Sequence, residues 1–228
     1  MRKSSREYWI DPESGISRSD FDLMYQDLVD PWGCHQALNS PRNHRFLDLI
    51  FRDGQTFRKI LDVGCGLGGL THQIMKRNGY GGLVTGIDIS KTAVNKAKSR
   101  YPECNFLPLD ICSDLSDNHD GTYDLVVLSE IIWYVADSLS KVLNAIRQML
   151  VPSGGAFLAV KLAIPQEQQY HRHIRGIVGF LDLMTRNGWE INRKVVLTET
   201  SESILLAIFS PLWKKWLCLF PPGVAPKA

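Results

Sequence analysis

The chain has 228 residues, 44% hydrophobic and 22% charged, which is typical of soluble globular proteins. This length can bury a core without disulfides or a structural metal, so intrinsic disorder and small cross-linked scaffolds are excluded. The 26 basic and 24 acidic residues give a net charge of +2, which disfavours a nucleic-acid partner.

Cysteine usage and apolar runs predict the compartment. Five cysteines, an odd number without a C-x-x-C pair, argue against a disulfide framework and a zinc site, and we expect no bound metal. No apolar run reaches the ~18 residues of a membrane span, and the N-terminal MRKSSREYWIDPES has no apolar stretch after its basic residues. We expect a cytoplasmic protein without a membrane span, and the composition is compatible with any oligomeric state.

Three regions are expected along the chain. Residues 1–40 are polar and turn-rich with scattered aromatic residues, which predicts an N-terminal arm or lid without a core of its own. Apolar residues recur at helical spacing after Pro41, so a helix leads into the domain, which we place at residues 41–212. Residues 213–228 read as a loose C-terminal tail.

Within the domain, short apolar runs alternate with helical segments. The runs lie at 59–64, 83–88, 105–110, 123–130 and 156–162, and the helical segments lie at 71–80, 91–101 and 138–150. This alternation predicts a parallel sheet with helices on both faces. A helix near 176–189 is followed by two β-rich runs, whose four-residue connection suits an antiparallel hairpin rather than another crossover.

A glycine loop follows the first predicted strand, in the segment LDVGCGLGG at 61–69. Glycine at such a strand-to-helix junction allows a tight turn and lets a ligand approach the helix N-terminus. The spacing Gly64-x-Gly66-x-x-Gly69, with Asp88 about 20 residues later to hold a ribose, also satisfies the dinucleotide fingerprint. The glycines therefore leave the choice of cofactor open.

Asp62 favours a cationic ligand for this loop. It precedes the first glycine by two residues, where the pyrophosphate of a dinucleotide would come close to it. Like charges in a partly desolvated loop repel strongly. The sulfonium and ammonium groups of S-adenosylmethionine would instead be attracted.

With these motifs, residues 59–162 resemble the class I S-adenosylmethionine-dependent methyltransferases. The glycine loop, the acidic residue in VTGIDIS (84–90), the acidic residue in FLPLDI (106–111) and the end of the fourth strand all match the family's pattern. The resemblance implies an α/β fold: a doubly wound, Rossmann-like seven-stranded sheet, mostly parallel with a C-terminal antiparallel hairpin, and helices on both faces.

The resemblance also implies the cofactor-binding residues. They are Asp62, Gly64 and Gly66 for the methionine portion, Asp88 and the following Ile89 for the ribose, Asp110 and Ile111 for the adenine, and Ser129 at the end of the fourth strand. Each acidic residue has a structural alternative. Asp62 could end a strand or cap a helix, Asp88 could cap the following helix, and Asp110 could cap a turn.

Candidate acceptor-side residues follow the fourth strand, because ligands bind at the carboxyl ends of strands in open α/β sheets. Glu130 could pair with an ammonium group or remove a proton, and its structural alternative is a partner for an arm residue. Trp133 and Tyr134 could form a pocket wall near a sulfonium or pack in the core. The Asn-Pro-Pro-Tyr type signature of enzymes that methylate nucleobases or protein amides is absent here.

Two further segments carry candidates. The chain also resembles the NodS-like branch, which N-methylates an amino sugar, at DLVDPWG (27–33), Ser40 and SEIIWY (129–134). Trp32 would then belong to a lid. Alternatively, it lies in a turn and fills a hydrophobic gap. His171 and His173 lie in the segment after the fifth strand, where the family often inserts substrate-binding elements. One of them could serve as a catalytic base, and the alternative is a solvated surface role.

The sequence therefore predicts an S-adenosylmethionine-dependent methyltransferase that acts on a nitrogen or oxygen of a small polar metabolite, plausibly a sugar or amino sugar. The candidate catalytic residues are Glu130, His171 and His173. A methyltransferase-like cofactor-binding subunit without catalysis is the main alternative. The charge of Asp62 makes a nicotinamide-dependent oxidoreductase the weaker one.

Overall fold

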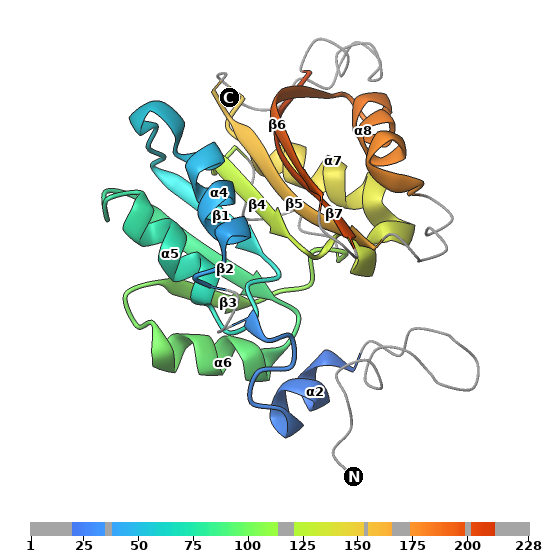
Figure 1. The fold of residues 1–228 in the computed structure, drawn as a ribbon. Coiled ribbons are helices and arrows are strands. Elements are labelled where there is room, and N and C mark those ends of the chain that lie inside the picture. The colour runs from blue at the N-terminus through green and yellow to red at the C-terminus, as the bar shows by residue number, and fades with distance from the viewer. Residues whose placement is uncertain are drawn as a thin grey trace, which may run out of the picture. The chain divides into compact units, whose positions relative to one another are not determined.

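The computed structural model describes residues 20–34, 38–113, 121–152, 155–165, 174–198 and 202–212 (Figure 1). The beginning of the predicted arm, residues 1–19, and the predicted tail, residues 213–228, lie outside them. Contacts divide the chain into two compact units, Met1–Asp114 and Leu115–Ala228.

The first unit contains three parallel strands in the order β3-β2-β1. β1 spans Lys59–Val63, β2 spans Leu83–Asp88 and β3 spans Asn105–Pro108. The helices α5 (Gly69–Arg77) and α6 (Lys91–Arg100) connect them. β1 and β2 are buried along most of their length, as expected for strands covered on both faces.

Helix starts in this unit follow local capping chemistry. Ser40 caps α4 (Pro41–Ile50), which has proline in its first turn and buries Phe46, Leu47 and Ile50. Ser90 caps α6 by accepting from the backbone N–H of Ala93 at 3.1 Å. The arm contains the short helix α2 (Phe21–Asp27), capped by Asp20. The helix predicted after Pro41 is confirmed.

The second unit contains four strands in the order β4-β5-β7-β6. β4 (Leu125–Ser129) and β5 (Phe157–Pro165) are parallel, whereas β7 (Glu202–Pro211) runs antiparallel to both β5 and β6 (Trp189–Thr198). The 3-10 helices η2 (Ile132–Tyr134) and η3 (Ala136–Ser138) follow β4, and α7 (Leu139–Met149) and α8 (Gly176–Arg186) complete the unit. The predicted C-terminal hairpin is confirmed.

The seven strands together confirm the predicted fold class, mostly parallel with a C-terminal antiparallel pair and with connecting helices (Figure 1). The apolar interior of the first unit centres on Ile60, Ile74 and Ile87, and that of the second on Leu125, Leu158 and Phe209. In the part of the chain that the structure describes, no helix has the length and apolar character needed to cross a membrane.

Candidate functional site

The glycine loop turns sharply between β1 and α5. Gly64, Gly66 and Gly68 have φ values of 74°, 51° and 79°, a region that side-chain-bearing residues rarely adopt. The backbone N–H groups of Gly64 and Cys65 donate to the carbonyl of Ile87 at 2.8 and 2.9 Å. The loop is thereby fixed against the carboxyl end of β2.

Asp88 ends β2 with its carboxylate against this loop. One oxygen accepts from the backbone N–H of Gly66 and the other from that of Ser90, both at 2.9 Å. Burial raises the pKa of the Asp88 carboxyl, and these two hydrogen bonds oppose the increase. The side-chain cap of α6 is Ser90 itself, so Asp88 connects the glycine loop to the start of that helix.

A second carboxylate, Asp62, lies on β1 just before the loop. It is 1% exposed, and the hydroxyl of Thr71 in α5 donates to it at 2.7 Å. Two carboxylates therefore flank the glycine loop, Asp62 before it and Asp88 bonded to its middle. This charge arrangement suits a ligand with cationic groups, as S-adenosylmethionine has, and it disfavours a pyrophosphate.

The residues predicted to contact adenine and ribose lie after β2 and β3. A carboxylate oxygen of Asp110 accepts from the backbone N–H of Cys112 at 2.8 Å, which is a capped turn of the kind expected as its alternative role. Ile111 is buried, whereas Ile89 is 52% exposed. The ligand contacts of these residues remain predictions.

The arm docks on α6 within the first unit. Figure 1 shows α2 beside α6, and the two helices are in contact. One oxygen of Asp22 accepts from the hydroxyl of Ser90 at 2.9 Å and from the backbone N–H of Thr92 at 2.8 Å. These hydrogen bonds, that of Thr92 first, lower the pKa of Asp22. The arm thus supplies an anion to the N-terminus of α6.

Tyr25 brings the arm to the glycine loop. Its hydroxyl lies 2.8 Å from the position that a Cβ on Gly66 would occupy, and burial together with the charge of Asp88 raises its pKa. Tyr25 and Met24 pack with Leu67 and Ala93, and Trp32 packs against this cluster. Trp32 lies within a turn in which the Asp30 carboxylate accepts from the backbone N–H of Cys34 at 2.9 Å. Both predicted roles of Trp32, lid and gap filler, are compatible with this position.

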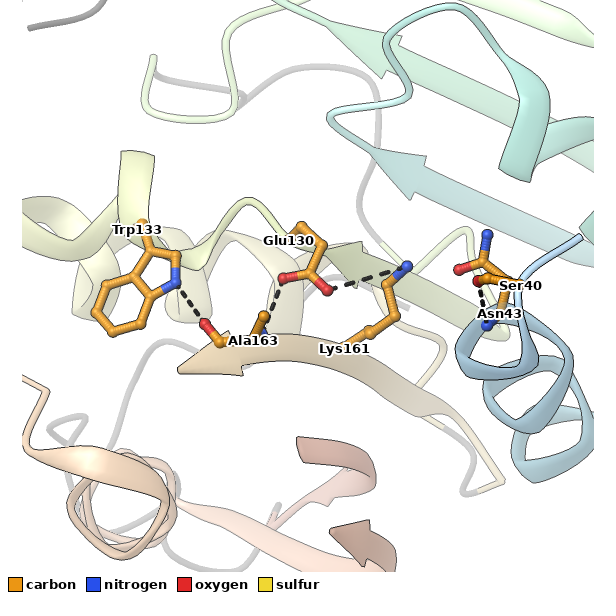
Figure 2. A network of polar contacts seen from close by, with 6 residues as sticks. All are labelled: Ser40, Asn43, Glu130, Trp133, Lys161 and Ala163. Carbon is orange, nitrogen blue, oxygen red and sulfur yellow. Dashed lines mark hydrogen bonds and ion pairs between the residues drawn. The ribbon is translucent and has the colours of Figure 1, made fainter. Parts of the chain in front are cut away.

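In the second unit, Glu130 immediately follows β4 with a φ of 60°, which is unusual for a residue with a side chain. Figure 2 shows its carboxylate between Lys161 and Ala163 of β5. One oxygen accepts from the backbone N–H of Ala163 at 2.9 Å, and the other lies 4.0 Å from the Lys161 ammonium. Ser129 is the register partner of Lys161. Glu130 is thus anchored to β5.

The aromatic candidates differ in their surroundings. The indole N–H of Trp133 donates to the carbonyl of Ala163 at 2.9 Å (Figure 2), whereas Tyr134 is 40% exposed.

The Ser40 and Asn43 side chains in Figure 2 belong to the start of α4, where the Ser40 hydroxyl accepts from the backbone N–H of Asn43 at 3.3 Å. His171 and His173 lie outside the described residues, so their roles remain predictions.

Three residues of interest were not found by sequence reasoning. The signal for Lys161 was present, because it is a charge within the apolar run AFLAVKL. Asp22 and Tyr25 carried no comparable signal, since their partners lie far away in the sequence. Within the described ranges, no group of three histidine, cysteine or acidic side chains is arranged to hold a metal ion.

The sequence matches a family model and a set of curated relatives. The family model described as "Methyltransferase domain" matches residues 60–154. The ubiquinone biosynthesis O-methyltransferase of Vibrio campbellii is 34% identical over 153 residues, which are 66% of this chain and 63% of that protein. The chain spans about three fifths of the length of the curated relatives that it matches first.

Solved structures share the fold at low identity. N-methyltransferase NodS from Bradyrhizobium japonicum WM9, in complex with S-adenosyl-L-homocysteine, has a TM-score of 0.66 at 22% identity and covers 83% of this chain and 99% of that one. The [4+2]-cyclase SpnF has a TM-score of 0.59 at 17% identity and covers 74% of this chain and 80% of that one. At these identities the likeness is one of fold alone.

The domain match, the two carboxylates at the glycine loop and the strand topology agree with one another. They agree with the resemblance to the class I methyltransferases that the sequence predicts, and the charges at the loop suit S-adenosylmethionine. Residues 60–154 of this chain match a methyltransferase domain, and the fold is shared with solved methyltransferase structures.

Proposed function

We propose that this chain transfers the methyl group of S-adenosylmethionine to a hydroxyl oxygen of a small polar metabolite. The observation that carries the proposal is the Asp88 carboxylate fixed against the glycine loop, with Asp62 preceding that loop. Oxygen is favoured over nitrogen because the curated relatives are named O-methyltransferases. Nothing in those names supports a sugar acceptor, so the acceptor class is taken more broadly as a hydroxyl compound.

The donor side is assigned to the first unit. Asp88 would accept hydrogen bonds from the ribose hydroxyls, and Asp62 with Gly64 and Gly66 would surround the methionine portion. Asp110, Ile111 and Ile89 would lie at the adenine and ribose. When bound, S-adenosylmethionine supplies a methyl group activated by a positively charged sulfur.

Glu130 is the residue that we assign to the acceptor hydroxyl. Its carboxylate is held by Ala163, yet the Glu130 side chain is 38% exposed, so it can still accept a hydrogen bond from a ligand. A hydroxyl becomes a better nucleophile when its proton is drawn toward such an acceptor, and the proton finally leaves to solvent. Trp133 and Tyr134 are proposed as walls beside it.

The acceptor atom can be tested with matched compounds. We expect S-adenosylhomocysteine to form with a hydroxyl compound and not with its amine counterpart, for example with catechol rather than o-phenylenediamine. Preferential turnover of the amines would contradict the oxygen assignment. Binding of S-adenosylhomocysteine without turnover of any compound would instead support a binding subunit without catalysis.

Replacing Glu130 by glutamine is expected to lower kcat by about 100-fold while leaving KM within a few-fold, because the carboxylate acts on the hydroxyl proton. Steady-state kinetics on the identified acceptor measures both constants. An increase in KM with kcat retained would indicate an ammonium-binding role instead. If Glu130→Gln is inert while His171→Ala or His173→Ala abolishes turnover, the base lies after β5.

The arm is expected to tighten when cofactor binds. Adding S-adenosylhomocysteine should slow amide exchange in residues 20–34, because Tyr25 and Trp32 lie next to the glycine loop. Equal exchange with and without ligand would leave Trp32 as static packing.

Asp22→Asn should make exchange in α2 roughly 2- to 5-fold faster by removing the charge at the α6 N-terminus. Since the pKa of Asp22 is lowered, its contribution is present above pH ~3.8 and is lost as the pH falls through the lowered value.

A further inference from the structure

The carboxyl end of β5 extends beyond the end of β4. The last register pair of the two strands is Ser129 with Lys161, and the backbone N–H of Glu130 donates to the carbonyl of Lys161 at 2.9 Å. Ala163 lies two residues beyond this last register pair, so β4 provides no residue opposite its backbone. Its polar groups need other partners, because buried backbone groups are costly when unpaired.

Two side chains of the turn after β4 provide those partners. Glu130 accepts from the N–H of Ala163, and Trp133 donates to its carbonyl, each at 2.9 Å (Figure 2). The side chains of Glu130 and Trp133 therefore make the two hydrogen bonds with Ala163 that a neighbouring strand would otherwise make. The positive φ of Glu130 places its carboxylate at this edge, and such strain tends to be retained at functional sites.

Lys161 faces the second oxygen of the Glu130 carboxylate. It belongs to β5, its side chain is only 10% exposed, and its ammonium lies 4.0 Å from the Glu130 oxygen that does not bond Ala163. A lysine in the interior of a strand is unusual, since burial of an ammonium is costly without a compensating charge. Glu130 supplies that charge.

We propose that Lys161 is a positioning residue for the acceptor site: its ammonium, carried by a largely buried side chain, and the N–H of Ala163 together hold the Glu130 carboxylate ionised and in one orientation. The inference rests on the proposed function only for the role of Glu130 toward the hydroxyl. The other titratable groups on the adjoining elements are Tyr134 in η2, Asp137 in η3 and Glu202, the register partner of Pro165 on β7. The β7 partners of Lys161 and Ala163 are Leu206 and Ile204, which carry no charge.

A carboxylate titration without cofactor or acceptor tests the holding role directly. In ¹³C NMR of the full chain labelled in glutamate carboxyl groups, Glu130→Gln identifies the Glu130 signal. We expect Lys161→Met to move the titration midpoint of this signal upward by about one pH unit, because a neighbouring cation favours the charged form. Lys161→Arg should restore most of the wild-type behaviour.

Lys194 offers a matched control, since it is an exposed lysine on β6 of the same unit. Lys194→Met should leave the Glu130 signal unchanged. Thermal unfolding of each variant shows whether Lys161→Met folds, and Lys161→Arg provides the comparison if it does not. An unchanged midpoint in folded Lys161→Met, or a midpoint that Lys161→Arg moves as far as methionine does, overturns the proposal.

Activity gives a second readout that separates the two proposals. The acidic limb of the kcat/KM profile should move upward by about one pH unit in Lys161→Met and remain in place in Lys161→Arg. If Lys161→Met moves the NMR midpoint but Glu130→Gln turns over normally, Lys161 still holds Glu130 and the proposed role of Glu130 is wrong. A uniform loss of activity without a shift in pH dependence would overturn the positioning role.

Discussion

Replacing Asp88 by alanine is expected to weaken binding of S-adenosylhomocysteine by about 1.5 to 3 kcal/mol, roughly 10- to 150-fold in Kd. Two charge-assisted hydrogen bonds to the ribose would be lost. The alanine also frees the backbone N–H groups of Gly66 and Ser90, which fix the loop and the start of α6. Isothermal titration calorimetry measures the change.

Asp182→Ala is a suitable control for this variant. Asp182 lies on α8 and forms an exposed ion pair with Arg186, so its loss should leave the affinity unchanged. Asp88→Asn separates the lost charge from the lost side chain. An Asp88→Ala protein that binds S-adenosylhomocysteine as tightly as wild type would remove Asp88 from the cofactor site.

Gly68→Ala should have the largest effect on stability, with a loss of about 2 to 5 kcal/mol in the free energy of unfolding. A Cβ at this position would lie 2.7 Å from the Phe106 ring and 2.9 Å from the Ala97 Cβ, both of which are buried. The φ of 79° adds strain for any residue with a side chain. Urea unfolding followed by circular dichroism measures the loss.

Gly79→Ala isolates the conformational part of this effect. Gly79 has a φ of 70°, but nothing lies within 4 Å of the position that its Cβ would take. It should cost about 1 to 2 kcal/mol, the strain of the left-handed region alone. Equal losses in the two variants would show that the contacts of Gly68 with Phe106 and Ala97 contribute nothing measurable.

The sequence alone determined the strand order in the chain, the glycine loop and the C-terminal hairpin. These features follow from local chemistry: alternating apolar runs set the elements, glycine permits the positive φ of the loop, and a connection of four residues is too short for a crossover. The acidic residues Asp62 and Asp88 were also found in this way, because their places relative to the glycines are fixed by the local strand-to-helix geometry. The charge of Asp62 then favoured S-adenosylmethionine over a dinucleotide.

Only the tertiary structure decided which distant residues meet. Asp22 reaches the backbone of Thr92, 70 residues away, and no local pattern of the arm encodes that partner. Lys161 stood out in its apolar run, but its pairing with Glu130 depends on the register of β4 against β5 and on where β4 stops. Local sequence sets the period and the turns of the chain, whereas hydrogen bonds between side chains far apart in sequence depend on how whole elements pack.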